Sequence, residues 1–464
     1  MGVSPNPFAR YQQRSPILAG QQLPLSIAQE TMLFWDRLVP RSPVYNVPTP
    51  LGISGPLNIE ALKRAITLIV SRHQVLRSNF LFIGGEPAQV AGPPDRVDFS
   101  LIDLSHLPSQ GKAAALQQAA QQEVQRPFDL AHDAMLRVRV FRGEVQDHIV
   151  TLTMHHIASD GWSVGVLVNE LSESYLAFST GREPNLPPLR IQYADWAKWQ
   201  RELLQGPMLE NLLSFWKQQL AGIPEFSDVL PLNRPRSAKQ SFDGGLVRTV
   251  LPDSFTAAMA QVGQMRRATV FMVMLAAFQA LLHRYSGREE IAIGAPVANR
   301  ARPELMALIG CFINMVVVRG IISGNPTFLE FLARLRETAL AAFFHPELPF
   351  SELVRHLRPK RSPNHTPYFQ VQLVFQNYPM PPIQWPGMTV KRLDMDSAAS
   401  KFDISVFIEQ KENEGLEIAF EYNASLFDHA AMEQMLGEYR LVLESVVKNP
   451  ETRLRDLPVP ARSS

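Results

Sequence analysis

The chain is poor in the residues on which several classes of protein depend. Its 464 residues include one cysteine, Cys311, which excludes an internal disulfide and a zinc site built from a cluster of cysteines and fits a reducing compartment. Its 45 basic and 44 acidic side chains nearly cancel, so no net charge draws it to nucleic acid or an anionic membrane. The most apolar stretch, residues 270–282, is shorter than the roughly 18 residues of a membrane span. Since the first residues also lack the apolar core of a secretory signal, we expect a soluble cytoplasmic protein.

Motifs for activating or storing a substrate are also missing. No phosphate-binding glycine-rich loop and no G-x-S-x-G elbow occur in the sequence. Cys311 lies in the apolar segment IGCFINMVVV, which predicts a small core residue rather than a nucleophile. Any activated substrate must therefore come from a partner.

The length and composition predict two folded lobes. With 46% hydrophobic and 19% charged residues, the chain has enough apolar mass for sizeable cores. Residues 1–22 are polar and punctuated by proline, which indicates a flexible tail or linker. The proline-rich segment TGREPNLPPLR (180–190) indicates the boundary between an N-terminal lobe over 23–185 and a C-terminal lobe over 186–460.

Hydrophobic spacing predicts strands and helices in both halves. Residues 57–80 have helical spacing, with Asn58 placed as the cap, and AMLRVRVFR and HIVTLTM alternate as a pair of strands. Helical spacing resumes at Val164. In the second half we expect helices near 269–285 and 327–343, and strands near 290–297, 312–319, 368–376, 402–409 and 416–422.

Two adjacent histidines precede an Asp-Gly pair in TMHHIASDGWS, residues 153–163. His156 and Asp160 have the spacing of metal ligands on a helix, but SDG is turn chemistry and no third ligand lies nearby. In a structural interpretation, one histidine packs in a turn and Asp160 forms hydrogen bonds with the local backbone. This is the ordinary role of an isolated pair of histidines. A third interpretation is acid–base chemistry between an acyl group and an amine or alcohol, because an imidazole titrates near neutrality.

The Asp-Gly pair adds two constraints. Gly161 has no side chain to obstruct a substrate. Asp160, if buried, needs a cationic partner, and arginine offers a two-pronged one. The spacing of the residues does not identify that arginine.

HHIASDG matches the HHxxxDG motif of the condensation domains of non-ribosomal peptide synthetases, and the chain resembles that family over most of its length. The short motif also occurs in epimerization domains, wax ester synthases and other acyltransferases that use a carrier or coenzyme A. Further matches in the family's order narrow the choice: LSIAQETMLFWDRL (25–38), RHQVLRSNF (72–80), YADWAKWQ (193–200), IGCFINMVVVR (309–319), HPELPFSELV (345–354) and RSPNHTPYFQVQLVFQN (361–377). KFDISVFIEQ and EYNASLFD continue the likeness to about residue 428.

The resemblance implies a mixed α/β fold, in which two chloramphenicol-acetyltransferase-like lobes form a V around a central tunnel. It implies that His156 is the active-site residue that reaches the acceptor amine, with His155 and Gly161 beside it. Asp160 would pair with Arg77 to hold the loop. Further candidates near the tunnel are Trp162, Ser163, Arg300 and Asn314. No metal is implied.

The implied reaction is peptide bond formation, in which the amine of an aminoacyl thioester attacks an upstream acyl or peptidyl thioester. Both thioesters would be carried on phosphopantetheine arms of donor and acceptor carrier proteins, so the chain itself would bind no cofactor. We expect an adjacent adenylation domain and a monomeric chain. His156 would serve as a general base or would position the amine.

SDGWS resembles the subtype that joins an L-configured donor to an L-configured acceptor. A starter subtype that takes a fatty acyl donor is a second choice. Two alternative functions are considered. One is a stand-alone acyltransferase that makes esters or amides from acyl-coenzyme A, and the other is a non-catalytic domain that docks a carrier or recruits another enzyme. The intact histidine motif favours catalysis, because degenerate copies usually lose it.

Overall fold

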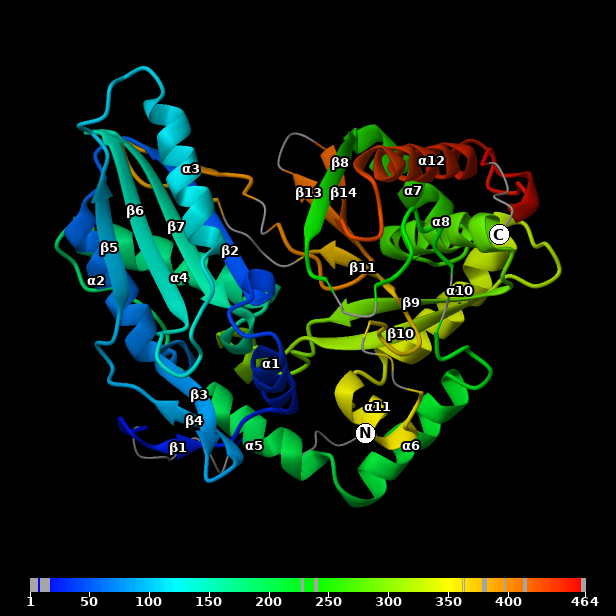
Figure 1. Ribbon diagram of the computed structural model, residues 1–464, viewed down its shortest axis with the longest axis horizontal. Coiled ribbons are helices and arrows are strands. Elements are labelled where there is room, and N and C mark those ends of the chain that lie inside the picture. The colour runs from blue at the N-terminus through cyan, green and yellow to red at the C-terminus, as the bar shows by residue number, and fades with distance from the viewer. Residues whose placement is uncertain are drawn as a thin grey trace. The chain divides into compact units, whose positions relative to one another are not determined.

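The chain divides into two compact units (Figure 1). The computed structural model describes residues 7–8, 17–226, 229–237, 241–360, 362, 364–377, 382–395, 398–411 and 415–459. The first unit contains Met1–Gly206, Ala298–Ile313 and Tyr378–Ser397, and the second contains Pro207–Val297, Asn314–Asn377 and Ala398–Ser464. The first unit is therefore built from three separate stretches of the chain.

The predicted boundary near residue 185 differs from this division. Helix α5 (Tyr193–Leu203) belongs to the first unit, because Tyr193 and Trp196 are buried in its core. No local change in composition marks the two later stretches that return to that unit. Most of the tail predicted over residues 1–22 lies outside the described residues, but Phe8 is fully buried with its ring 5.3 Å from Trp199.

A five-stranded sheet organises the first unit. Its strand order is β12 (Thr389–Arg392), β2 (Asn46–Ser54), β7 (Asp147–His155), β6 (Leu136–Glu144) and β5 (Asp98–Asp103). β5 runs parallel to β6 and the other pairs are antiparallel, so the predicted pairing of 134–142 with 148–154 is confirmed. A smaller sheet joins β1 (Gln22–Leu23), β4 (Glu86–Ala91) and β3 (Ser78–Ile83).

The alternation of side chains along the strands explains why helices cover both faces of this sheet. Val150, Leu152 and Met154 point into the main core with α2 (Ile59–Arg72) and α4 (Gly161–Ser179). Phe141 points to the other face, where it packs against α3 (Lys112–Gln125). Helix α1 (Ile27–Leu38) and the short α9 (Pro303–Met306) also belong to this unit.

The predicted helix over residues 57–80 ends earlier than its spacing indicates. Asn58 caps it as predicted, with its side-chain oxygen accepting from the Ala61 amide, but α2 ends at Arg72. His73 is extended and buried, and its ring contacts Glu170 and the Ile309 amide. These long-range contacts turn the chain into a short 3₁₀ turn and then into β3, which periodicity alone does not reveal.

The second unit contains a six-stranded sheet. Its order is β10 (Asn314–Ile321), β9 (Glu290–Val297), β11 (Val371–Gln376), β13 (Ile404–Lys411), β14 (Gly415–Asn423) and β8 (Gly244–Leu251). β11 is parallel to both neighbours, and the other pairs are antiparallel. The strands predicted in this half are confirmed to within a few residues.

The helices of the second unit begin with α6 (Gly206–Gln219). They include α7 (Asp253–Gln264), α8 (Val270–Ser286), α10 (Phe328–Phe343), α11 (Phe350–Leu357) and α12 (His429–Lys448). α8 is apolar on every side because α7, α10 and α12 all pack against it. Gly287 ends α8 in the left-handed conformation, at φ 67°. Within the described residues, no helix is both long and apolar enough to cross a bilayer.

His148 on β7 makes the stability of the first unit sensitive to acid. It is 3% exposed, and its Nδ1 has no hydrogen-bond partner. Burial, and next the Arg142 charge, lower the pKa of His148 below its ordinary 6.5, while the Asp147 carboxylate opposes this. The unfolded chain then binds more protons than the folded one, so this contribution to stability is present above pH 6.5 and is lost as pH falls through the folded-state pKa.

We expect His148→Gln to reduce the acid sensitivity of the fold. The thermal midpoint of the wild type should fall more steeply between pH 7 and pH 5 than that of the variant, while the two curves run parallel above pH 7. Calorimetry over this range measures the difference. The exposed His106 provides a control, since His106→Gln should keep the wild-type pH slope. Equal slopes for wild type and His148→Gln would contradict the assignment.

Candidate active site

The histidine motif occupies the connection between β7 and α4, as predicted. β7 ends at His155, a 3₁₀ turn spans His156–Ala158, and α4 begins at Gly161. The Ser159 hydroxyl donates to the His155 carbonyl at 3.1 Å. Asp160 is the N-cap of α4 and accepts from the Ser163 amide at 2.9 Å, where a carboxylate also complements the helix dipole.

The contacts of His155 are those of a residue that stabilises the fold. Its side chain is 3% exposed, and its Nδ1 accepts from the Ile157 amide at 3.1 Å. Since Nδ1 is an acceptor, the ring proton of the neutral imidazole lies on Nε2. The ring packs between Tyr45 and Phe128, at centroid distances of 5.9 and 5.6 Å. These contacts hold the end of β7 in place.

His156 differs from its neighbour because its side chain is only partly buried. Its Nδ1 lies 3.9 Å from the sulfur of Cys311. Of the two adjacent histidines, the second is thus the better placed to meet a substrate.

Asp160 is fully engaged within the first unit. It is 2% exposed, and besides the Ser163 amide its Oδ1 accepts from the Ser163 hydroxyl at 2.7 Å and from Arg300 Nη2 at 3.0 Å. Its Oδ2 accepts from the Phe312 amide at 3.0 Å. Because both of its carboxylate oxygens accept from these buried donors, Asp160 holds the loop in place.

The predicted pair of Asp160 with Arg77 is wrong. Arg77 is buried at the end of the 3₁₀ turn Gln74–Arg77, where it donates to the Gly92 carbonyl and makes no ion pair with Asp160. Burial lowers the pKa of Arg77. The backbone carbonyl of Arg77 also accepts from the Gly92 amide at 2.9 Å. Arg77 is thus bonded to Gly92 through both its side chain and its backbone, which stabilises the smaller sheet.

Arg300 takes the place predicted for Arg77. Its guanidinium donates to the Leu308 carbonyl at 2.7 Å, pairs with Asp160, and lies 4.0 Å over the Phe312 ring. Burial lowers the pKa of Arg300, and the Asp160 carboxylate opposes this effect. The sequence predicted a cationic partner for a buried Asp160, but Arg300 was expected only near the tunnel, and 140 residues separate it from Asp160 in the chain.

The residues after Asp160 contact the returning segment Ala298–Ile313. Ser163 is fully buried, and its hydroxyl lies 2.9 Å from the Gly310 carbonyl and 3.0 Å from the Gly310 amide. The Trp162 indole donates to the Met306 carbonyl at 2.9 Å. Gly161 begins α4 and is partly buried. Ser163 therefore locks two loops together, while Trp162 keeps an exposed side.

Asn314 lies in the second unit and has a structural role there. Its side-chain amide donates to the Pro346 and Leu348 carbonyls at 2.8 and 2.7 Å, and its side-chain oxygen accepts from the Phe350 amide at 3.0 Å. These bonds fix the segment that leads into α11.

Sequence reasoning missed Tyr193, Gly310 and the orientation of Cys311. The buried Tyr193 hydroxyl lies 2.6 Å from the Cys311 carbonyl. A Cβ on Gly310 would stand 2.0 Å from the Tyr193 ring, so only glycine fits this close approach. A glycine before an apolar run is a weak signal, and nothing local indicates that the Cys311 side chain faces a histidine.

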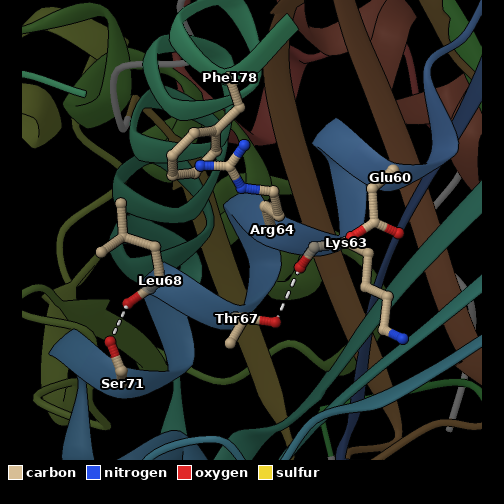
Figure 2. A pocket seen from close by; sticks show the side chains of 7 residues that line it. All are labelled: Glu60, Lys63, Arg64, Thr67, Leu68, Ser71 and Phe178. Atoms are coloured by element: carbon tan, nitrogen blue, oxygen red, sulfur yellow. Dashed lines mark hydrogen bonds between the residues drawn. The ribbon is translucent and has the colours of Figure 1, made fainter. Parts of the chain in front are cut away.

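A hollow on the outer side of α2 contains none of these residues (Figure 2). Its lining residues are Glu60, Lys63, Arg64, Thr67, Leu68, Ser71 and Phe178. The Arg64 guanidinium lies 4.1 Å from the centroid of the Phe178 ring. Among the residues that the structure describes, no cluster of histidine, cysteine and carboxylate side chains has the composition of a metal site.

Comparison with known proteins identifies the same family as the order of the sequence motifs. A family model described as Condensation domain matches residues 19–463. The chain is 40% identical to a linear gramicidin synthase of Brevibacillus parabrevis over 96% of its own length, which is 6% of that protein. It is 38% identical to the phosphinothricin tripeptide synthetase PhsC of Streptomyces viridochromogenes over 95% of its length, or 40% of that protein. The chain thus spans a small part of the gramicidin synthase and under half of PhsC.

Solved structures show the same fold. The X-domain from teicoplanin biosynthesis superposes with a TM-score of 0.85 at 26% identity, covering 96% of this chain and 99% of that one. The first condensation domain of the calcium-dependent antibiotic synthetase superposes with a TM-score of 0.78 at 19% identity, covering 95% of this chain and 100% of that one. The mixed α/β fold class is confirmed by the sheets and helices of both units and by these likenesses.

Proposed function

Since the chain belongs to the condensation-domain family, whose members transfer acyl groups to form amide bonds in non-ribosomal peptide synthesis, we propose that His156 is its catalytic residue. In the proposed reaction the amine of a carrier-bound aminoacyl thioester attacks the carbonyl carbon of an upstream thioester. A C–N bond forms and the C–S bond breaks. The amine loses one proton and the departing thiolate takes one, so no oxidant, metal or further reactant is needed.

This proposal rests on the differences in burial and hydrogen bonding among the three ionisable side chains of the motif. Asp160 is buried with its oxygens occupied, and His155 is buried with Nδ1 occupied. His156 is partly exposed at the end of a strand whose position these two residues secure. An imidazole with a pKa near neutrality, held by such a support, suits proton transfer and the positioning of an amine.

The substrates and partners are those that the reaction needs. We propose phosphopantetheine thioesters on donor and acceptor carrier proteins, an adjacent adenylation domain, and a monomeric chain in the cytoplasm. The greater length of the synthetase relatives supports neighbouring domains. We also propose an L-configured donor and acceptor, on the likeness of SDGWS to that subtype.

Reconstitution with loaded carriers tests the function. Donor carriers bearing an acyl group and acceptor carriers bearing an amino acid are mixed with the protein, and product is followed by intact-protein mass spectrometry. We expect the acyl group to move to the acceptor carrier with wild-type protein and not with His156→Ala. A parallel reaction supplies acyl-coenzyme A without carriers. Turnover in that reaction alone would identify a stand-alone acyltransferase instead.

The likeness to the teicoplanin X-domain favours one second candidate, a recruiting domain without chemistry. A solved complex joins that X-domain to OxyB, and its X-domain is 27% identical to this chain. The intact HHIASDG and the 40% identity to a gramicidin synthase favour catalysis. Product formation that is unchanged in His156→Ala would favour recruitment.

A further inference from the structure

We infer that Cys311 is a positioning residue for His156, which holds the imidazole by Nδ1 and favours its neutral form. The inference rests on the proposed function, in which His156 meets the reacting groups. It concerns the only cysteine of the chain, whose apolar neighbours in sequence predict a plain core residue. The structure confirms the burial of Cys311 but turns its sulfur toward the histidine.

The backbone around Cys311 is fixed from both sides. The Gly310 amide lies 3.0 Å from the Ser163 hydroxyl, and the Phe312 amide donates to Asp160 at 3.0 Å. Between them the Cys311 carbonyl lies 2.6 Å from the Tyr193 hydroxyl. The groups that shape the histidine loop thus also determine where the Cys311 sulfur lies, so the sulfur and His156 are held in one frame.

The contact selects one side of the imidazole ring. Sγ of Cys311 lies 3.9 Å from Nδ1 of His156, and the thiol is fully buried. A thiol is a weak donor with one proton and a weak acceptor. With Nδ1 directed at the sulfur, Nε2 is the ring nitrogen that would approach the acceptor amine.

A thiol at Nδ1 favours neutral imidazole over imidazolium. The S–H group can donate to the lone pair of a neutral Nδ1, whereas for a protonated Nδ1 the sulfur is a weak acceptor. Hydrogen bonding to the neutral form of a base disfavours its protonation. His156 would then stay neutral to lower pH than an imidazole without this contact.

Several ionisable groups near this pair have contacts of their own. Burial raises the pKa of both Tyr45 and Tyr193, and their proximity to Cys311 adds to it, so both stay neutral hydroxyls. Asp160 and Arg300 neutralise each other as a buried ion pair. The Nδ1 of His155 accepts from the Ile157 amide.

Three proteins test the inference: wild type, Cys311→Ser and Cys311→Ala. Single-turnover condensation is measured from pH 5.5 to 8.5 with loaded carriers. Serine keeps an O–H donor, but its C–O bond is shorter than the C–S bond, so the hydroxyl lies farther from Nδ1 than the sulfur does and Cys311→Ser should move the acid limb in the same direction as Cys311→Ala, by no more than that variant. Alanine removes the donor, so the acid limb of Cys311→Ala should move to higher pH. We expect a rate about 3- to 10-fold below wild type near pH 6 that converges toward wild type at pH 8.5.

Two outcomes would overturn the inference. One is a Cys311→Ala profile equal to wild type at every pH. The other is an equal loss in both variants with the acid limb unmoved, which is the result of packing alone. Thermal unfolding of each variant verifies that it is folded. His156→Ala separates this test from the proposed function: if it condenses normally, the catalytic assignment fails, whereas an inactive His156→Ala beside a wild-type Cys311→Ala refutes only the role of the thiol.

Discussion

Asp160→Ala is expected to lower the free energy of unfolding of the first unit by about 3–5 kcal/mol, because it leaves the Arg300 charge buried without its partner. The Phe312 and Ser163 amides also lose their acceptor. Urea unfolding followed by tryptophan fluorescence measures the loss. Product formation should disappear as well, since the loop that carries His156 is no longer held.

A double-mutant cycle with Arg300 separates the pair from its packing. Arg300→Met should also be strongly destabilising, because it leaves the Asp160 carboxylate buried alone. The double variant Asp160→Leu with Arg300→Met should recover part of the stability, since no unpaired charge remains. Arg77→Met serves as the comparison, because Arg77 bonds to the Gly92 carbonyl and forms no ion pair with Asp160, so its effect should add to that of Asp160→Ala. A loss below about 1 kcal/mol in Asp160→Ala would contradict a buried ion pair.

His156→Ala is expected to lower kcat for condensation by about 10²–10⁴-fold, the range for loss of a general acid or base. Stability should change little, because the side chain is partly exposed at the surface of the first unit. The effect on KM should be small if the imidazole acts mainly in the transition state. Rapid-quench single-turnover measurements separate the chemical step from carrier binding.

The neighbouring histidine gives the matched control. In His155→Asn the side-chain oxygen can take the place of Nδ1 as the acceptor for the Ile157 amide. We therefore expect His155→Asn to retain much more activity than His156→Ala or His156→Asn. A larger loss in His155→Asn, in a protein with wild-type stability, would exchange the roles of the two histidines.

The parts of the site that local patterns determine could be predicted from the sequence. The alternation of Val150, Leu152 and Met154 located β7, and Asp160 before a helical pattern located the start of α4. The partner of Asp160 could not be predicted in this way. Arg77 and Arg300 both lie in family-like segments, and only the tertiary fold determines which guanidinium reaches the carboxylate.

The same limit explains the errors in the fold. His73 ends α2 through contacts with Glu170 and Ile309, which lie far along the chain. The proline-rich segment at 180–190 resembles a domain boundary in composition, yet α5 after it is anchored in the first unit by buried aromatic rings. Periodicity detects elements, whereas pairing over long sequence distances decides where they end and to which unit they belong.

Because the first unit includes Ala298–Ile313 and Tyr378–Ser397, it cannot be completed during synthesis until most of the chain has left the ribosome. A fragment that ends at Gly206 has the histidine motif but lacks both Arg300 and β12, the edge strand that pairs with β2. If one half of this protein were exchanged for that of a relative, β2 and β12 would come from different proteins, and so would Asp160 and Arg300. Successful chimaeras should therefore transfer residues 298–313 and 378–397 together with the N-terminal segment.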